Sequence, residues 1–265
     1  MTGYLTVITK SGDMVRYLSA GDGDEYIVFI HGNLASSIWW KETLSRLKPG
    51  FKAYALDLPG SGETPETGHT HTMEYMAAFV AEFIEALGIR PVHLVGHSMG
   101  GGTAQLVAIN YPDMVKKLVL VDTLPMHGFP ELTGLGDEWF RTLMSDKMMI
   151  RMGMKAIMPH LNDDFYFEQI VDHAASSSRQ VFFENPKAMS SANWSMKIGS
   201  IVAPVLFVHG LEDTLIPVNT VLMTAQAIKG SSFTYVDNCG HCPMIEVPDR
   251  FNEILFNFLA NGRTS

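Results

Sequence analysis

The segment L-V-G-H-S-M-G-G, which ends at Gly101, places a serine within the pattern G-x-S-x-G. Apolar residues precede the pattern, and a helical pattern follows it to about Tyr111. In a strand-to-helix turn of this kind the serine has strained backbone geometry, and flanking glycines such as Gly96 and Gly100 prevent collisions. The turn exposes the hydroxyl, and the helix start offers N–H donors to an oxyanion. The pattern therefore predicts that Ser98 is a nucleophile.

A serine hydroxyl becomes a good nucleophile only when a base removes its proton and an acid orients that base. The turn around Ser98 is typically followed along the chain by the acid and then by the histidine. Asp213 follows a predicted strand in G-L-E-D-T-L-I-P, and His241 follows the next strand in N-C-G-H-C-P. We therefore expect His241 to be the general base and Asp213 its acid. Glu212 and Asp122 also lie near strand ends, and Asp122 is the main alternative.

Two cysteines flank the candidate histidine, which raises the alternative of a metal site. Cys239 and Cys242 are the only cysteines of the chain, and no second Cys/His pair at ligand spacing accompanies them. A structural zinc site needs four ligands. A disulfide between these cysteines would close too small a loop to brace the chain. We therefore expect no metal and no catalytic role for the cysteines.

Composition limits the class of protein. The 265 residues are enough for one large core, and 46% hydrophobic with 18% charged residues is typical of a folded globular domain. A net charge of −9 argues against binding to nucleic acid. The N-terminal residues lack a secretion signal, and no apolar run is long enough to span a bilayer, so we expect a cytoplasmic protein without a membrane partner.

Short runs of Val, Ile and Leu alternate with longer helical patterns, which predicts an α/β fold with a mostly parallel sheet. The clearest helix is Met73–Leu87, with Thr72 as its N-cap and Gly88 at its end. A last helix is expected from about Pro248 to Leu259. We expect the first two strands to form a hairpin. The predicted strands are Tyr4–Thr9, Met14–Ser19, Tyr26–Ile30, Lys52–Leu56, Val92–Val95, Leu118–Val121, Val205–Val208 and Phe233–Val236.

The strand signal disappears between Asp122 and Val205, where the sequence indicates several short helices. We interpret residues 124–197 as an inserted helical cap, or lid, and residues 1–123 and 198–265 as the core domain. Nine of the 17 methionines fall in this insertion. Since methionine is flexible, these residues either form a pliable wall for an apolar ligand or fill ordinary helix interfaces.

Several motifs together resemble the α/β-hydrolase superfamily over nearly the whole chain. They are H-G-N-L from His31, D-L-P-G-S-G from Asp57, G-H-S-M-G-G from Gly96, G-L-E-D from Gly210 and G-H-C-P-M-I-E-V-P from Gly240. The resemblance implies an eight-stranded sheet, no cofactor, and a cap between the sixth and seventh strands. It implies that the backbone N–H groups of Asn33 and Met99 form an oxyanion hole. It also implies that Asp57 is structural and that Glu246 supports the histidine loop.

The motifs also resemble members with other chemistries. H-G-N is similar to haloalkane dehalogenases, in which an asparagine at the Asn33 position holds the halide. Those enzymes and the related epoxide hydrolases have an aspartate at the position of Ser98. G-H-S-M-G-G-G-T-A is similar to hydrolases that cleave carbon–carbon bonds of ring-fission products. These typically have a tryptophan after the histidine and an asparagine before the serine, where this chain has Cys242 and His97.

A serine nucleophile with this triad favours acyl transfer. The sequence therefore predicts a serine carboxylesterase that hydrolyses small to medium, largely apolar carboxylic esters or lactones through an acyl-enzyme. We expect a monomer or homodimer whose partner is the small-molecule substrate. Two alternatives stay open: a ligand receptor or signalling protein that has the triad but little turnover, and a carbon–carbon bond hydrolase.

Overall fold

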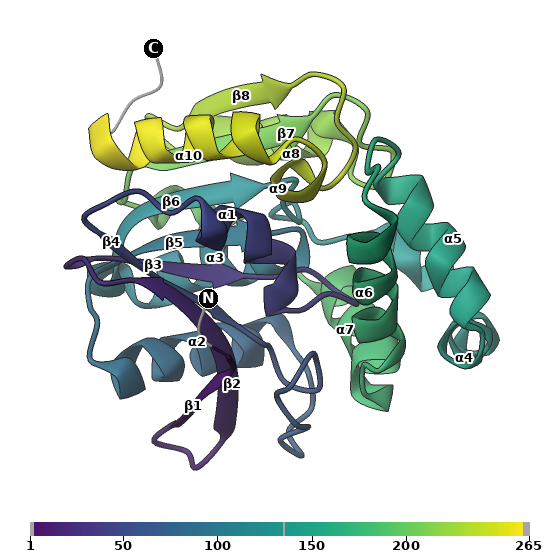
Figure 1. Ribbon diagram of the computed structural model, residues 1–265. Coiled ribbons are helices and arrows are strands. Elements are labelled where there is room, and N and C mark those ends of the chain that lie inside the picture. Colours follow the sequence, from purple (N-terminus) through teal and green to yellow (C-terminus); the bar gives the residue numbers. More distant parts are fainter. Residues whose placement is uncertain (1–2, 135, 262–265) are drawn as a thin grey trace.

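The computed structural model describes residues 3–134 and 136–261, which form a central sheet between two helical layers (Figure 1). The sheet has eight strands in the order β1-β2-β4-β3-β5-β6-β7-β8. The pairs β1·β2 and β2·β4 are antiparallel, and all other pairs are parallel. All eight predicted strands are confirmed. Their bounds are β1 (Leu5–Ile8), β2 (Met14–Gly21), β3 (Glu25–Ile30), β4 (Phe51–Leu56), β5 (Val92–His97), β6 (Val115–Val121), β7 (Val205–Gly210) and β8 (Ser232–Val236).

The position of each strand in the sheet explains its sequence. Every residue of β5 and β7 is buried, because helices cover both faces of a parallel sheet and both sets of side chains must be apolar or paired. The edge strand β1 is mostly exposed and pairs only with β2 in the expected hairpin. Apolar runs therefore mark the central strands more clearly than the edge.

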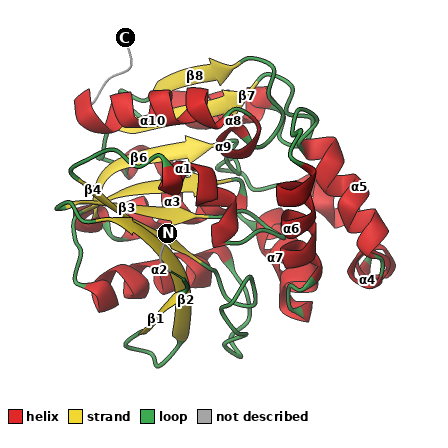
Figure 2. Cartoon of the chain, viewed as in Figure 1, coloured by secondary structure: helices red, strands yellow, loops and turns green. Residues whose placement is uncertain are grey.

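Helices lie on both faces of the sheet (Figure 2). One cluster of buried side chains includes residues of α2, α3 and α8, and a second cluster, on the other face, includes residues of α1 and α10. The helix bounds are α1 (Lys41–Ser45), α2 (Met73–Leu87), α3 (Met99–Asn110), α4 (Asp137–Ser145), α5 (Lys147–Ile157), α6 (Asp164–Ala175), α7 (Arg179–Ser191), α8 (Val218–Gln226), α9 (Pro243–Glu246) and α10 (Pro248–Asn261).

Local capping residues define α2. The Thr72 hydroxyl oxygen accepts a hydrogen bond from the Tyr75 N–H, and Gly88 adopts the left-handed conformation with φ 66°. A side-chain acceptor satisfies an N–H that the first turn leaves without a partner, and glycine tolerates positive φ without a Cβ clash. Both predicted ends of this helix are confirmed.

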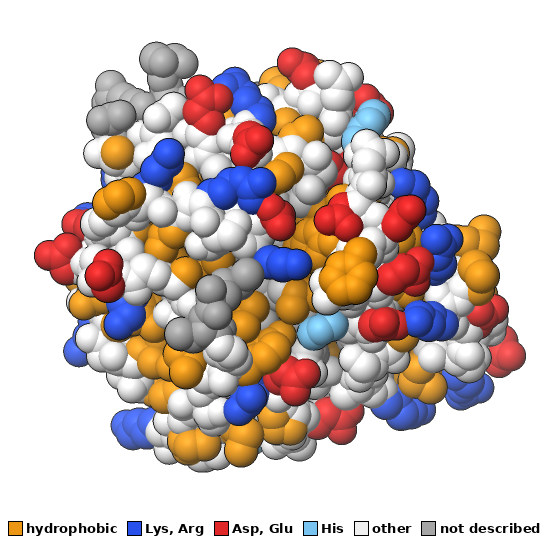
Figure 3. Space-filling model, in the orientation of Figure 1, with side chains coloured by type: hydrophobic (Ala, Val, Ile, Leu, Met, Phe, Trp, Pro, Cys, Tyr) orange, Lys and Arg blue, Asp and Glu red, His pale blue; other side chains and the backbone are white. Residues whose placement is uncertain are grey.

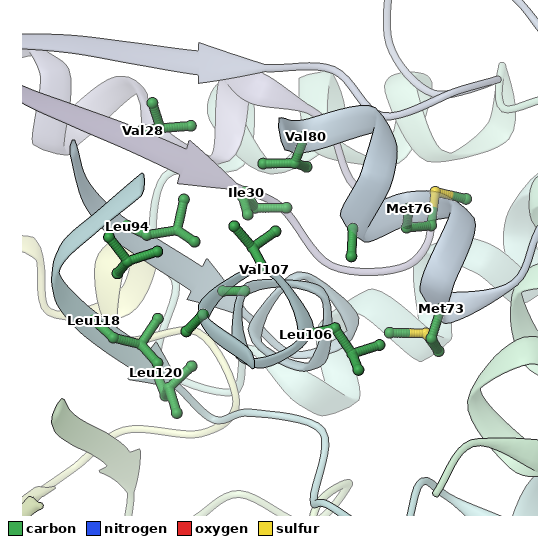
Figure 4. Packing of buried hydrophobic residues seen from close by; sticks show 14 of the residues in the cluster. Val28, Ile30, Met73, Met76, Val80, Leu94, Leu106, Val107, Leu118 and Leu120 are labelled. Carbon is green, nitrogen blue, oxygen red and sulfur yellow. The ribbon is translucent and has the colours of Figure 1, made fainter. Parts of the chain in front are cut away.

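Helix α3 packs against the sheet through buried apolar side chains (Figure 4). Val107 of α3 lies near Ile30 and Leu94, which belong to β3 and β5 (Figure 4). The N-terminal turn of α3 has only glycine where it meets the strands: a Cβ atom at Gly100 would lie 2.4 Å from the carbonyl oxygen of His31. This close packing fixes the start of α3, where Ser98 is located, against the ends of the strands.

The helices α4, α5, α6 and α7 are inserted between β6 and β7 and lie at one end of the sheet (Figure 1). We call this segment the helical insertion. Its existence agrees with the expected interruption of the strand pattern, whereas the division into a core domain and a cap domain stays a prediction. Within the described residues, no helix is both long enough and apolar enough to cross a membrane.

Candidate active site

Ser98 occupies the turn between β5 and α3 with φ 53° and ψ −120°. A positive φ is strained for a residue with a Cβ atom, so the surroundings must hold it in place. The Ser98 N–H donates to the carbonyl oxygen of Val121, and the Ser98 carbonyl oxygen accepts from the Leu124 N–H. A Cβ atom at Gly96 would lie 2.3 Å from the Gly100 carbonyl oxygen, so the turn does require glycine there.

His241 and Asp213 form a buried pair on neighbouring loops. The His241 Nδ1 atom lies 2.8 Å from Asp213 Oδ2, and Asp213 Oδ1 accepts hydrogen bonds from the backbone N–H groups of Leu215 and Ile216. Burial alone would raise the pKa of this carboxyl, but the neighbouring imidazole and the backbone donors lower it to about 2. Asp213 is therefore ionised near neutral pH and able to hold the imidazole in one orientation.

The loop that carries His241 is held from three sides. The His241 N–H donates to the carbonyl oxygen of Ile157 at the end of α5, and the His241 carbonyl oxygen accepts from His97 Nε2. The next residue, Cys242, donates its N–H to Glu246 Oε1. The support from Glu246 agrees with the sequence prediction, whereas the contact with Ile157 links the helical insertion directly to the histidine.

Two backbone N–H groups expected in an oxyanion hole lie beside the serine. A Cβ atom at Gly32 would lie 3.0 Å from the Cβ atom of Ser98, so the loop that continues to Asn33 passes directly by the nucleophile. Among the described hydrogen bonds, the N–H groups of Asn33 and Met99 have no acceptor. Both therefore remain available to a substrate oxygen, as an oxyanion hole requires.

The Asn33 side chain is oriented by Asn185, a residue that was not predicted from the sequence. Asn33 Oδ1 accepts a hydrogen bond from Asn185 Nδ2 of α7, at 2.9 Å, and Asn185 Oδ1 lies 2.7 Å from His71 Nδ1. Asn185 and His71 are both buried. The bond joins residues that are 152 positions apart, so no local pattern in the sequence could have indicated it.

An apolar cavity of about 260 Å³ lies between the helical insertion and the strand ends, and Ser98 and His241 are both on its wall. Among the described residues that line it, none is Asp, Glu, Lys or Arg. Its polar residues are Asn33, His97, Ser98 and His241, and its apolar wall includes Trp39, Leu124, Trp139, Phe140, Ile150, Phe182 and Leu215. The structure therefore joins the predicted nucleophile and base to a site suited to an uncharged, largely apolar ligand.

Charged side chains of the helical insertion lie on its outer surface. Acidic and basic side chains are interspersed over the right of the view in Figure 3, where the insertion lies. Two pairs link α5 to α6 there, Lys147 with Asp172 and Arg151 with Glu168. The charges that make these helices amphipathic therefore do not enter the cavity.

The methionines of the insertion have different surroundings, and only some of them line the cavity. Met149, Met154 and Met189 line the cavity. Met148 and Met152 are instead 59% and 66% exposed. Part of the methionine-rich segment therefore forms a flexible pocket wall, and part of it faces away from the pocket.

The cysteines beside His241 are free, buried thiols. Burial raises the pKa of both Cys239 and Cys242, so both are neutral near pH 7. In the described part of the chain, the only group of three side chains whose donor atoms lie close enough for a cation is Asp122, His209 and Asp213. Because Asp213 already accepts a hydrogen bond from His241, a cation there would compete with the histidine.

We expect that prolonged EDTA treatment changes neither the activity expected of Ser98 and His241 nor the melting temperature. The reason is that, among the residues the structure describes, the cysteines do not belong to a group of side chains that could hold zinc. The double replacement Cys239→Ser and Cys242→Ser should likewise keep most of the activity, with a lower melting temperature because two buried apolar side chains become polar. Elemental analysis and thermal unfolding provide the measurement; one zinc per chain, lost together with activity, would contradict this expectation.

Comparisons with known proteins match part of the chain for a family model and nearly all of it for individual proteins. A family model described as alpha/beta hydrolase fold matches residues 25–148. A 2-hydroxy-6-oxononadienedioate/2-hydroxy-6-oxononatrienedioate hydrolase of Escherichia coli O81 (strain ED1a) is 26% identical over 269 residues, which cover 94% of this chain and 91% of that protein.

Two solved structures are similar to it in fold. An esterase from Exiguobacterium antarcticum superposes with a TM-score of 0.86 at 20% identity, covering 97% of this chain and 99% of the other. The enol-lactonase from Burkholderia xenovorans LB400 gives a TM-score of 0.82 at 20% identity, covering 97% and 100%. At this level of identity the similarity establishes the fold and leaves the reaction open.

Proposed function

The chain is an α/β-hydrolase-fold protein, and we propose that it is a serine carboxylesterase acting on small to medium, largely apolar carboxylic esters or lactones. One observation carries this proposal. The strained Ser98 and His241, which is hydrogen-bonded to Asp213, both lie on the wall of one apolar cavity whose described lining has no charged side chain. A location in the cytoplasm and a monomeric or homodimeric state stay predictions from the sequence.

In the proposed reaction, Ser98 Oγ attacks the ester carbonyl carbon while His241 Nε2 accepts the hydroxyl proton. Asp213 holds the Nδ1–H tautomer, which leaves Nε2 free to act as the base. The N–H groups of Asn33 and Met99 stabilise the oxyanion, a contribution of about 10²–10³ in rate for one donor in comparable enzymes. His241 then protonates the leaving alcohol, and a water molecule activated by the same histidine releases the acid from Ser98.

The absence of charged side chains from the described cavity wall favours an ester over the substrate named for the Escherichia coli relative. That name describes a dioate, a molecule with two carboxylate groups. Proteins usually bind a carboxylate through Arg or Lys, and burial of an unpaired carboxylate costs several kcal/mol. Since neither residue type occurs among the described lining residues, this cavity suits an uncharged substrate better.

A matched pair of p-nitrophenyl esters tests this proposal. We expect p-nitrophenyl butyrate to be hydrolysed with a kcat/KM about 100-fold higher than the p-nitrophenyl monoester of succinate, because only the latter brings a carboxylate into the apolar cavity. Esters of increasing chain length and a set of lactones, measured beside this pair, define the preferred acyl group.

Two results would replace the proposal by one of its alternatives. Faster turnover of a vinylogous ring-fission diketone than of every ester would establish carbon–carbon bond hydrolysis, which the similarity to the Escherichia coli relative favours. Tight binding of an apolar ester without multiple turnover would indicate a ligand receptor.

A further inference from the structure

Asp122 is a fully buried carboxyl group at the end of β6, and the proposed reaction does not use it. Its backbone has φ 40°, a strained value for a residue other than glycine. The Asp122 N–H donates to the Val208 carbonyl oxygen, and Asp122 Oδ1 accepts from the Gly210 N–H at 2.9 Å. These bonds tie the end of β6 to the end of β7.

The second oxygen of this carboxyl, Asp122 Oδ2, has no N–H or hydroxyl donor among the described residues, and the Asp122 carboxyl lies close to the carboxyl of Asp213, the proposed catalytic acid. A donor atom of each of Asp122, Asp213 and His209 lies within 4.8 Å of the other two. Two buried carboxylates at this separation repel each other strongly when both are ionised. One of the two must carry a proton, which then lies between their oxygens.

The distribution of donors decides which carboxyl carries that proton. Asp213 accepts hydrogen bonds from two backbone N–H groups and from His241, all of which stabilise its charged form. Asp122 accepts a single backbone bond, and its burial and the charge of Asp213 raise its pKa well above the ordinary range. The pKa of Asp213 is lowered to about 2. The proton therefore belongs to Asp122.

Other titratable groups near Asp122 do not favour its ionisation. The buried Cys239 and Cys242 are neutral thiols, since burial raises the pKa of each. Burial likewise lowers the pKa of His209, so its ring is neutral and supplies no positive charge. The groups that face Asp122 from the neighbouring elements are Asp213, Glu246, His209, Cys239 and Cys242.

We propose that Asp122 is a neutral carboxylic acid whose Oδ2–H donates a hydrogen bond to the Asp213 carboxylate and thereby positions that carboxylate for His241. The role in catalysis rests on the proposed esterase function, whereas the shared proton does not. The arrangement adds a donor to Asp213 without adding a second negative charge beside the imidazole. Asp122 is thus a positioning residue that acts through Asp213.

The pair of variants Asp122→Asn and Asp122→Leu tests the positioning role. Asparagine keeps a donor toward Asp213 and an acceptor for the Gly210 N–H, so we expect at least a tenth of the wild-type kcat. Leucine keeps the size and removes both the donor and the acceptor of the Gly210 N–H, so we expect its kcat to lie at least tenfold below that of Asp122→Asn, with little change in KM. Equal activity of the two variants would overturn the proposal, because the donor would then have no role.

The pH profile separates a neutral Asp122 from an ionised one. If Asp122 is neutral, Asp122→Asn changes no charge, and the acid limb of kcat/KM against pH keeps its position. If Asp122 were ionised, its neutralisation would remove a negative charge that favours the imidazolium, and the acid limb would move to lower pH. Such a shift would refute the proposal.

Infrared spectroscopy tests the proton without relying on esterase activity. At neutral pH, the difference spectrum of the wild-type protein minus Asp122→Asn should contain the C=O stretch of a buried, protonated carboxylic acid. Its absence from a folded pair of proteins would overturn the shared proton, even if the esterase function holds. Its presence in a protein that hydrolyses no ester would leave the shared proton in place and reject only the role in catalysis.

Discussion

Replacement of Ser98 by alanine is expected to lower kcat/KM for ester hydrolysis by about 10⁴ or more, because no acyl-enzyme can form without the Oγ nucleophile. The fold should be retained. The described structure shows no hydrogen bond from the Ser98 side chain, and alanine meets the same backbone strain at φ 53° as serine does. The measurement is steady-state hydrolysis of p-nitrophenyl butyrate by the purified variant, with circular dichroism and the melting temperature as tests of folding.

A second buried serine provides the matched control for this variant. Ser177 is 9% exposed, as Ser98 is, and it lies in the loop between α6 and α7, outside the cavity wall. We expect Ser177→Ala to keep its activity within about twofold of wild type, since a substitution away from the site mainly changes stability by a small amount. Turnover at the wild-type rate in folded Ser98→Ala would refute the nucleophile and, with it, the proposed esterase mechanism.

The replacement Asp213→Asn has the second largest expected effect, a fall in kcat of about 10³ to 10⁴. An amide in place of the carboxylate can donate to His241 Nδ1, which favours the tautomer with its proton on Nε2 and removes the base from the serine. The 2.8 Å contact between Nδ1 and Oδ2 makes Asp213 the only described carboxyl that reaches this nitrogen. Because the pKa of Asp213 is about 2, the wild-type carboxylate stays ionised from pH 5 to 9, and no pH in this range should restore the variant.

Glu212→Gln is the control for the acid, since Glu212 is the adjacent residue and was an alternative in the sequence. Its carboxylate pairs with His160 at 2.8 Å, and 49% of its side-chain surface is exposed. Exposed ion pairs contribute little, so we expect activity within about twofold of wild type. If Glu212→Gln or Asp122→Asn were inactive and Asp213→Asn active, the residue whose replacement abolishes activity would be the catalytic acid. Ser98 and His241 would keep their roles.

The sequence determined the features of this protein that depend on neighbouring residues. The central strands are recognisable because a parallel strand buried on both faces needs a continuous apolar run, as in β5 and β7. The ends of α2 at Thr72 and Gly88 follow from local hydrogen bonding and backbone conformation. The turn around Ser98 is local in part, because Gly96 relieves a contact with the Gly100 carbonyl oxygen, whereas Gly100 relieves one with the distant His31 carbonyl oxygen.

The order of the triad was also predictable, since parallel strands bring the loops at their carboxyl ends to one edge of the sheet. The sequence alone could not decide whether Asp213 or Asp122 is the acid, because both residues follow a strand. In the structure, Asp213 contacts His241 Nδ1, while Asp122 bonds to the end of β7 and lies near the Asp213 carboxyl. Which carboxyl reaches the imidazole is a matter of side-chain direction, which strand position alone does not specify.

Only the tertiary structure decided the contacts between the helical insertion and the site. A helical pattern in a methionine-rich segment indicates which residues share a face, but Met154 is 5% exposed and Met152 is 66% exposed for reasons that lie in the docking of α5. The bonds of Asn185 to Asn33 and of Ile157 to His241 likewise join residues 152 and 84 positions apart. A hydrogen bond formed by chain packing depends on where two distant segments meet, and neither segment's own sequence specifies that position.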